Sequence, residues 1–347
     1  MYCPKCGTQN ANDALTCVSC GYAFTGAAPV DSPVEVRRSG LAVAAFVLGI
    51  LSFITLSLTA IPAMILGIIA LITIGTSGGR RTGTALAVLG IVLPVLSVVV
   101  TLMVILMPAL SRVRAQAMRV QCMSHLRELS MAWYLYASDN DGRVVNGAAG
   151  SDRAGAGGGF ETAWTGMDWA AGYKIGEQLP RHEQESAIRH GLLFPYCAAI
   201  EPYRCPAGRA GQLRTYAIVD AMNGAPREGT EERGVYVKQL FGISGAATRA
   251  VFIDQGWAGP GSFPVHYAKP EWWCAPPLTH RDGTAVAFGD GHVEPWRWEA
   301  PETRKIARRP DDDYGPEHVA PQTREGKDDL KKFQTAVWGQ VDYAPVP

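Results

Sequence analysis

Residues Leu41 to Ile74 read LAVAAFVLGILSFITLSLTAIPAMILGIIALITI, and residues Thr84 to Leu110 read TALAVLGIVLPVLSVVVTLMVILMPAL. Neither stretch contains a charged side chain, and each is long enough for at least one helical membrane span of about 20 residues. A buried helix cluster in a soluble protein is the alternative, but so many uncharged positions disfavour it. We therefore expect a transmembrane region over residues 40–110 and a lipid bilayer as a partner.

The number of helices depends on Thr59-Ala-Ile-Pro62, in the middle of the first stretch. Proline can end one helix and begin another, so this stretch is either a tight hairpin of two short helices or one tilted span. The polar sequence Ser77-Gly-Gly-Arg-Arg-Thr-Gly83 separates it from the second stretch. The region thus contains two or three helices.

Arginines that flank the apolar stretches predict how the chain lies in the membrane. With three spans and a cytoplasmic N-terminus, the chain after Leu110 is extracytoplasmic; with two spans it is cytoplasmic. We favour three, because the cysteines that follow suit an oxidising compartment, although Arg112, Arg114 and Arg119 favour the opposite orientation. Four arginines then lie on the cytoplasmic side: Arg37, Arg38, Arg80 and Arg81.

The first 25 residues contain two cysteine pairs of the form Cys-x-x-Cys-Gly. Four protein thiolates complete a tetrahedral zinc site and leave no position open for a substrate, which predicts a structural zinc ribbon. Disulfides or a redox pair are the alternative, and a cytosolic N-terminus disfavours them. Because no apolar signal segment precedes the motif, we expect that N-terminus to be retained in the cytoplasm. The expected Zn²⁺ ligands are Cys3, Cys6, Cys17 and Cys20, followed by a linker over residues 26–39.

The overall composition limits the remaining function classes. The formal net charge is zero, so no global field attracts nucleic acid, and we expect no nucleic-acid partner. No constellation of side chains indicates a catalytic site or a small-molecule substrate. The sequences Leu48-Gly-Ile50, Leu66-Gly-Ile-Ile-Ala-Leu71 and Ser77–Gly83 lie within about residues 40–105. With them, this region resembles an uncharacterised bacterial module of two to three membrane helices found behind zinc ribbons, which implies anchoring and no known chemistry.

An amphipathic helix is predicted over about residues 108–138. Apolar residues recur there at steps of three and four, which places them on one helical face for a protein core. A turn cluster, Ser138-Asp-Asn-Asp-Gly142, ends the pattern. The predicted core stripe is Met118, Cys122, Leu126, Leu129, Trp133 and Tyr136.

Short β-branched and aromatic runs between turns predict an antiparallel sheet in the rest of the chain. They occupy residues 214–220, 234–238, 250–254 and 284–288. With the long helix, they make residues 111–347 an α+β domain. The predicted fold class is therefore a membrane-anchored multidomain protein with a small zinc ribbon, transmembrane helices and an α+β domain.

This domain resembles the pseudopilin-like proteins of type II secretion that occur in planctomycete-type bacteria. The resemblance covers about residues 105–345 and rests on Met107–Cys122, on Trp133–Gly142, and on a histidine separated from Asp-Gly by nine intervening residues. It implies a long helix on an antiparallel sheet, pilin-like protein partners and a bacterial inner-membrane location. Its signature residues, which we expect to be structural, are His280, Asp290, Gly291 and His292.

The chain departs from ordinary prepilins at the cleavage site. Gly83 is the nearest candidate, and the fifth residue after it is Val88, where a prepilin has glutamate. Cleavage there would also remove the zinc ribbon. We therefore interpret the domain as a pilin-like ectodomain on a different anchor.

Two further sites have open alternatives. His280, Asp290 and His292 are either metal ligands of a membrane-bound metal-dependent hydrolase or hydrogen-bonding residues of turns. Cys197 and Cys205 form a disulfide, pair separately with other cysteines, or remain buried thiols. We expect a structural or interaction protein rather than an enzyme; a hydrolase and a zinc-ribbon sensor are the alternatives.

Overall fold

The computed structural model describes residues 1–24, 37–55, 58–77, 81–150, 161–169, 178–226, 235–307 and 318–343. It divides into two compact units, Met1–Ala109 and Leu110–Pro347. Most of the predicted linker over residues 26–39, and Arg80, lie outside the described residues.

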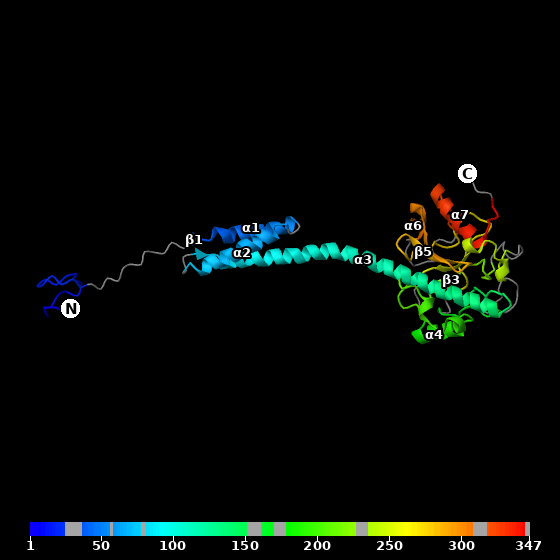
Figure 1. Cartoon of the computed structure of the whole chain (residues 1–347), viewed down its shortest axis with the longest axis horizontal. Helices are drawn as coiled ribbons and strands as arrows, with labels where there is room; N and C mark the ends of the chain where they lie inside the picture. Colours follow the sequence, from blue (N-terminus) through cyan, green and yellow to red (C-terminus); the bar gives the residue numbers. More distant parts are fainter. Residues whose placement is uncertain are drawn as a thin grey trace. The chain divides into compact units, whose positions relative to one another are not determined.

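The apolar sequence forms three helices: α1 spans Gly40–Ile54, α2 spans Ala60–Gly75 and α3 spans Thr84–Asp139 (Figure 1). Pro62 lies in the first turn of α2, where its missing N–H removes no helical hydrogen bond. Among the described helices, only α3 is long and apolar enough to cross a membrane. At 15 and 16 residues, α1 and α2 are shorter than a full span, so a multi-pass anchor stays a prediction.

Small side chains make the contacts among these three helices. A Cβ added to Gly90 of α3 would lie 2.7 Å from Ala45 Cβ of α1. A Cβ added to Gly67 of α2 would lie 2.7 Å from Ile91 Cγ1 of α3. Close helix packing through glycine and alanine is typical of membrane helices, because it maximises van der Waals contact where lipid supplies no hydrophobic driving force. The buried small residues of α1 and α2 include Ala42, Ala45, Ala60, Ala63 and Ala70.

Most of the large aliphatic side chains of the same helices point outward, although Ile74 of α2 is buried. Ile54 of α1 is 75% exposed and Ile61 of α2 is 67% exposed. A bundle in water would bury such residues and expose polar ones. The apolar part of α3 repeats the pattern with Val92, Val95, Leu96, Leu102, Met103 and Val104.

Two short strands join the starting ends of α1 and α3. β1 (Arg37–Arg38) pairs in parallel with β2 (Arg81–Thr82), with Arg37 opposite Arg81. The amide of Ser39 also donates to the Thr82 carbonyl oxygen at 3.0 Å. The structure thus brings together basic residues that lie more than 40 positions apart in the sequence.

The C-terminal unit contains the predicted antiparallel sheet. Its order is β3 (Tyr216–Ile218), β4 (Ala250–Asp254), β5 (Gly283–Phe288) and β6 (Val293–Arg297). Neighbouring strands are antiparallel throughout, and a bulge at Ala250/Phe252 shifts the register between β4 and β5.

One of the predicted strands is wrong. Residues 235–238 are loop, because their backbone bonds to separate partners: the Val237 amide donates to the Ala221 oxygen, and the Lys238 oxygen accepts from Val144. The fourth strand is β6 instead, which contains Pro295. Proline is tolerated in this position because β6 is the last strand of the sheet.

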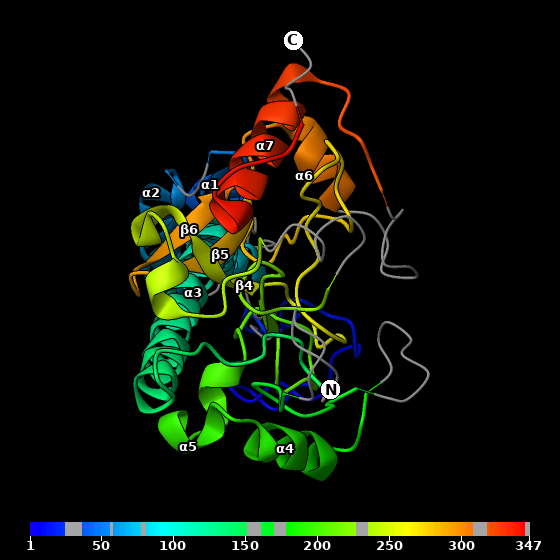
Figure 2. The same cartoon turned by 90° about the vertical axis from the view of Figure 1, so that its right-hand side faces the viewer.

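The predicted stripe on the long helix forms part of the domain core. Leu126, Leu129 and Trp133 of α3 are fully buried in one cluster with Phe252 of β4 and Phe333 of α7. The sheet lies between α3 and α7 (Arg324–Trp338) (Figure 2). Burying one large apolar side chain of this kind contributes about 1.5–3 kcal/mol.

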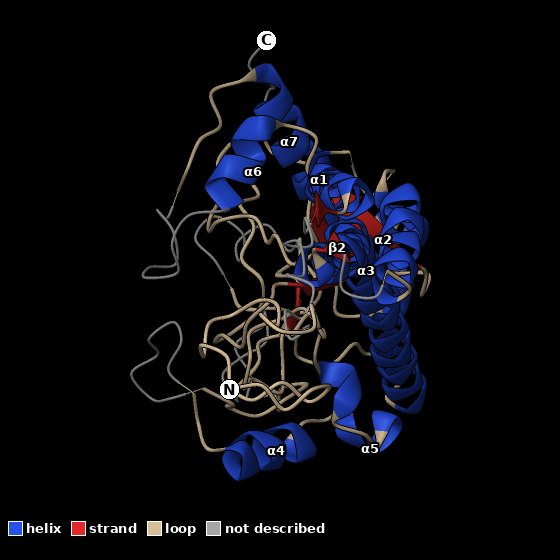
Figure 3. Cartoon of the chain, turned by 90° about the vertical axis from the view of Figure 1, so that its left-hand side faces the viewer, coloured by secondary structure: helices blue, strands red, loops and turns tan. Residues whose placement is uncertain are grey.

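Much of the remaining domain is loop (Figure 3). Buried polar contacts stabilise these loops. Arg214 and Asp168 form a fully buried ion pair, with Nη2 to Oδ1 at 2.7 Å and Nε to Oδ2 at 2.9 Å. Arg214 also donates to the carbonyl oxygens of Tyr216 and Gly259, so the charge has several partners. The short helices are α4 (Arg181–His190), α5 (Phe194–Cys197), η1 (Glu201–Tyr203), η3 (Leu240–Gly242), η4 (Ala246–Thr248) and α6 (Pro301–Ala307).

We predict that Gly90→Ala destabilises the helix packing by about 1–3 kcal/mol, because the added methyl group would overlap Ala45. Gly75→Ala is the matched control, since a Cβ there meets nothing within 4 Å. Thermal unfolding of the full chain in detergent, followed by circular dichroism, should show a lower midpoint for Gly90→Ala alone. Equal midpoints for the two variants would contradict the packing.

Candidate metal centre

The N-terminal segment folds as two copies of one turn, fourteen positions apart. In the first copy the Gly7 amide donates to the Cys3 oxygen at 2.9 Å; in the second the Gly21 amide donates to the Cys17 oxygen at 3.0 Å. Gly7 and Gly21 have φ of +73° and +67°, which disfavours any residue with a Cβ. Nothing lies within 4 Å of a Cβ added at either position, so a larger side chain would meet no atom there. The positive φ of the backbone is therefore the reason that these positions favour glycine.

The two turns bring the four predicted thiols together. The sulfur atoms of Cys3 and Cys20 are 3.7 Å apart, those of Cys6 and Cys17 are 3.5 Å apart, and all four lie within 4.8 Å of one another. A tetrahedron with metal–sulfur bonds of about 2.3 Å has edges of about 3.8 Å. The cluster therefore has the spacing needed to hold a metal ion and fits a zinc ribbon.

Backbone amides and neighbouring thiols control the ionisation of this cluster. The Ser19 N–H donates to Cys17 and lowers the pKa of its thiol to about 6. For Cys20 the Tyr22 N–H acts in the same direction, but the thiols of Cys6, Cys3 and Cys17, together with burial, raise the pKa to about 12. Four thiolates at this spacing repel one another, so a bound cation is what allows all of them to ionise.

Asn10 is a supporting residue that the sequence reasoning missed. Its side chain is 7% exposed, accepts from the Val18 amide at 2.9 Å, and donates to the Thr8 oxygen at 2.8 Å and to Cys17 Sγ at 3.6 Å. It thus links the loop of one turn to a ligand of the other. The fourteen-residue repeat gave no signal for it, because Asn10 aligns with Phe24 in the second copy.

The signature residues of the C-terminal domain do not lie together. Asp290 and His292 form an exposed pair, with Oδ1 and Nδ1 2.5 Å apart, at the turn before β6. Gly291 has φ of +87° in that turn, which suits a structural role. His280 is buried elsewhere in the domain, with Nε2 3.3 Å from Asp254 Oδ2 and 3.4 Å from Cys205 Sγ. Among the described residues, three groups of side chains could each share a metal ion, and none of the three includes Asp290 or His292.

The surroundings of His280 change its protonation. Burial lowers the pKa of the imidazole, but hydrogen bonds with Asp254 and Cys205 outweigh burial and raise it to about 9. Cys205 responds in the opposite sense: hydrogen bonds from Cys122 and His280 lower the pKa of its thiol, against the effect of burial.

The predicted partners Cys197 and Cys205 are both free thiols in the structure. Cys197 ends α5 and is half-buried, whereas Cys205 is fully buried beside His280. A third group, His266, Glu271 and His318, lies near the surface. Its two histidine nitrogens are 2.7 Å apart, a distance that fits a direct hydrogen bond.

No protein-family model, curated protein or solved structure matches this chain.

We predict that Asn10→Ala lowers the affinity of the ribbon for Zn²⁺ by about 10–100-fold, because residues that orient the ligands contribute that much in other metal sites. Asn12→Ala is the matched control: Asn12 is exposed and accepts only from the N-terminal ammonium in the described contacts. Competition with a chromophoric chelator measures both affinities in the full chain. Equal affinities would show that Asn10 does not orient the ligands.

Proposed function

We propose that this chain is a membrane-anchored structural or interaction protein of a bacterial inner membrane, with a zinc ribbon at its N-terminus and a pilin-like α+β domain after the anchor. The observation that carries the proposal is the packing of α1, α2 and α3. These helices bury glycine and alanine and expose large aliphatic side chains, which is stable in lipid and unfavourable in water.

The pairing of β1 with β2 supports an orientation for the anchor. It gathers Arg37, Arg38 and Arg81 at one end of the helices, and basic residues favour the cytoplasmic side. α3 begins at this end, at Thr84, and its apolar stretch continues to Leu110. A span that begins in the cytoplasm places the residues after Leu110 on the extracytoplasmic side.

Zinc is the ion that best suits the ribbon. Four thiolates in tetrahedral spacing favour a soft or borderline ion, and Zn²⁺ is the common choice for such sites. Because so short a segment cannot bury much apolar surface, metal binding would supply most of its folding free energy, about 10–16 kcal/mol in comparable peptides. The role would be structural, since no ligand position is left open.

The α+β domain supports an interaction role and a resemblance to pseudopilins. A long helix packed on an antiparallel sheet is the architecture that this resemblance implies. A groove of about 900 Å³ between η4, β6 and α7 offers a surface for a protein partner. Its lining combines aromatic, basic and acidic groups, among them Trp296, Lys332 and Glu294.

The geometry of its own residues does not support the alternative of a membrane-bound hydrolase with His280, Asp290 and His292 as metal ligands. His280 is buried with Asp254 and Cys205, while Asp290 and His292 pair with each other at the surface. A catalytic metal needs ligands that converge on one point and an open position for water. These three side chains do not provide that arrangement.

We predict that a membrane-impermeant maleimide labels Glu183→Cys but not Arg81→Cys in intact cells, each compared with the parent chain. Glu183 is exposed on α4 of the domain, and Arg81 is exposed in β2. Lysed cells, in which both positions react, are the control. Labelling of Arg81→Cys alone would indicate the opposite orientation of the chain in the membrane. Release of the chain from membranes by alkaline carbonate would refute the membrane anchor.

The interaction role is tested by photo-crosslinking in native membranes. Thr335 is exposed and lines the groove, so a photoreactive amino acid at this position should give a discrete cross-linked band. Glu183, exposed on α4 and not part of the groove lining, is the matched control position. Mass spectrometry then distinguishes a second copy of the chain from another protein. Absence of a specific band at Thr335 would contradict a partner in the groove.

A further inference from the structure

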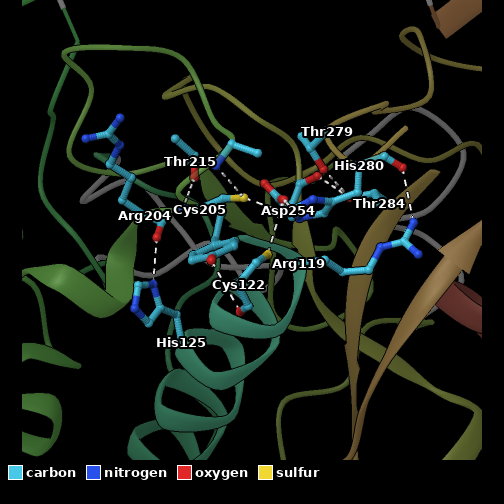
Figure 4. A network of polar contacts seen from close by, with 12 residues as sticks. Arg119, Cys122, His125, Arg204, Cys205, Thr215, Asp254, Thr279, His280 and Thr284 are labelled. Carbon is cyan, nitrogen blue, oxygen red and sulfur yellow. Dashed lines mark hydrogen bonds and ion pairs between the residues drawn. The ribbon is translucent and has the colours of Figure 1, made fainter. Parts of the chain in front are cut away.

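A second group of metal-ligating side chains lies inside the C-terminal domain, distinct from the ribbon. Cys122, Cys205 and Asp254 are fully buried, and His280 is 5% exposed. One sulfur, nitrogen or oxygen atom from each lies within 4.8 Å of the other three. Figure 4 shows the two sulfur atoms, the carboxylate and the imidazole directed toward a common point.

The distances within this group suit a tetrahedral ion. Cys122 Sγ is 3.3 Å from Asp254 Oδ2, Asp254 Oδ2 is 3.3 Å from His280 Nε2, and His280 Nε2 is 3.4 Å from Cys205 Sγ. Zinc bonds of about 2.0–2.3 Å predict tetrahedral edges of about 3.3–3.8 Å for mixed sulfur, nitrogen and oxygen ligands. The ribbon sulfur atoms, at 3.5 and 3.7 Å, fall in the same range.

The carboxylate is incompletely satisfied by the protein. Asp254 Oδ1 is buried and has no hydrogen-bond partner among the residues that the structure describes. Leaving one oxygen of a buried carboxylate unpaired is unfavourable, because the oxygen loses its hydration and gains no hydrogen bond in return. A cation held by Asp254, Cys122 and Cys205 would offset that cost, because it neutralises the negative charges that converge there.

Cys205 has the local geometry of a metal knuckle. It begins the sequence Cys205-Pro-Ala-Gly208, and the Ala207 amide donates to its sulfur at 3.4 Å. In the ribbon, Cys3 is also followed by proline, and the Lys5 amide donates to its sulfur at the same distance, 3.4 Å. The Cys205 amide is itself fixed by Thr215 Oγ1 at 2.7 Å. Such outer contacts orient ligands in metal sites.

The loop that carries His280 is fixed as well. Arg119 of α3 donates to the His280 carbonyl oxygen at 3.2 Å and to Asp282 Oδ1 at 2.7 Å. Arg281, between these two residues, has φ of +48°, a conformation that non-glycine residues seldom adopt. The loop is therefore held in one shape that directs the imidazole inward (Figure 4).

We propose that Cys122, Cys205, Asp254 and His280 bind a structural Zn²⁺ ion inside the α+β domain. Two thiolates, one imidazole and one carboxylate favour zinc over Mg²⁺ or Ca²⁺, which prefer oxygen ligands. All four positions come from buried protein side chains, so the ion has no open position for a substrate.

The ion would join four separate parts of the chain. Cys122 lies on α3, Cys205 follows η1, Asp254 ends β4, and His280 precedes β5. It would therefore fasten the helix that carries the apolar segment to the sheet of the domain. Metal binding at such a site contributes directly to folding free energy, because the unfolded chain does not hold the four ligands together.

The test begins with a full-length chain that has no ribbon ligands, in which Cys3, Cys6, Cys17 and Cys20 are all replaced by serine. Purified in detergent, it should retain about one zinc ion per chain by mass spectrometry of the metal. X-ray absorption at the zinc edge should then show about two sulfur and two nitrogen or oxygen ligands. A zinc content below about one-tenth of an ion per chain overturns the proposal.

Substitutions in this background identify the ligands. His280→Gln and Asp254→Asn should each weaken zinc binding at least about 10-fold. His292→Gln is the matched control on the exposed pair, and His318→Gln controls for the group with His266 and Glu271. Loss of zinc with His318→Gln and retention with His280→Gln would place the ion elsewhere and overturn the proposal.

The unmodified chain gives a readout that does not depend on how any variant folds. It should contain about two zinc ions with, on average, about three sulfur ligands each, whereas the ribbon alone gives one ion with four. A disulfide between Cys122 and Cys205, detected by mass spectrometry without reduction, is the competing outcome. It removes both thiolates from the group and overturns the proposal.

Discussion

The structure depends on the continuity of α3, which is one helix of 56 residues. Within lipid, every backbone N–H and C=O must bond inside its own segment, and a helix is the only way for a single chain segment to do so. The same helix then supplies Leu126, Leu129 and Trp133 to the core of the α+β domain. No independent turn separates the two roles, so the domain begins on the helix that carries the apolar sequence.

The change of role along α3 is visible in its side chains. Before Leu110 the large aliphatic residues are exposed, and the buried positions, such as Ala87 and Gly90, are small. After Met118 the buried positions include the large apolar residues Leu126, Leu129 and Trp133, while Arg127 and Glu128 are exposed. One helix therefore carries an apolar outer surface in its first part and a core-facing apolar stripe in its second part.

The parts of the structure that follow from local sequence patterns could be predicted. The Cys-x-x-Cys-Gly repeat defined the ribbon, and the three- and four-residue steps defined the core face of α3. Strand β6 was missed because Pro295 reads as a strand breaker, and only its place at the sheet edge makes it tolerable. Residues 235–238 have strand-like composition, but their hydrogen-bond partners lie in separate loops.

Side-chain groups assembled from distant segments could not be predicted in the same way. In the sequence, Cys122 looks like an ordinary core residue of the apolar stripe on α3, and Asp254 looks like the polar residue that ends a strand. What joins them to Cys205 and His280 is the packing of α3 on the sheet, which no local spacing encodes. His280 was singled out by its sequence distance from Asp290, yet its contacts are with Asp254 and Cys205.

This grouping also changes the argument about where the domain lies. The later cysteines suggested an oxidising compartment because four of them were available to pair. Yet Cys122 and Cys205 occupy a group with a histidine and an aspartate, and a thiolate bound to a metal is not available to form a disulfide. The case for an extracytoplasmic domain then rests on the arginines that β1 and β2 bring together and on the direction of α3 away from them. That case depends on charge and helix direction and not on the redox state of individual thiols, and it weighs the arginines of β1 and β2 against Arg112, Arg114 and Arg119 after the apolar stretch.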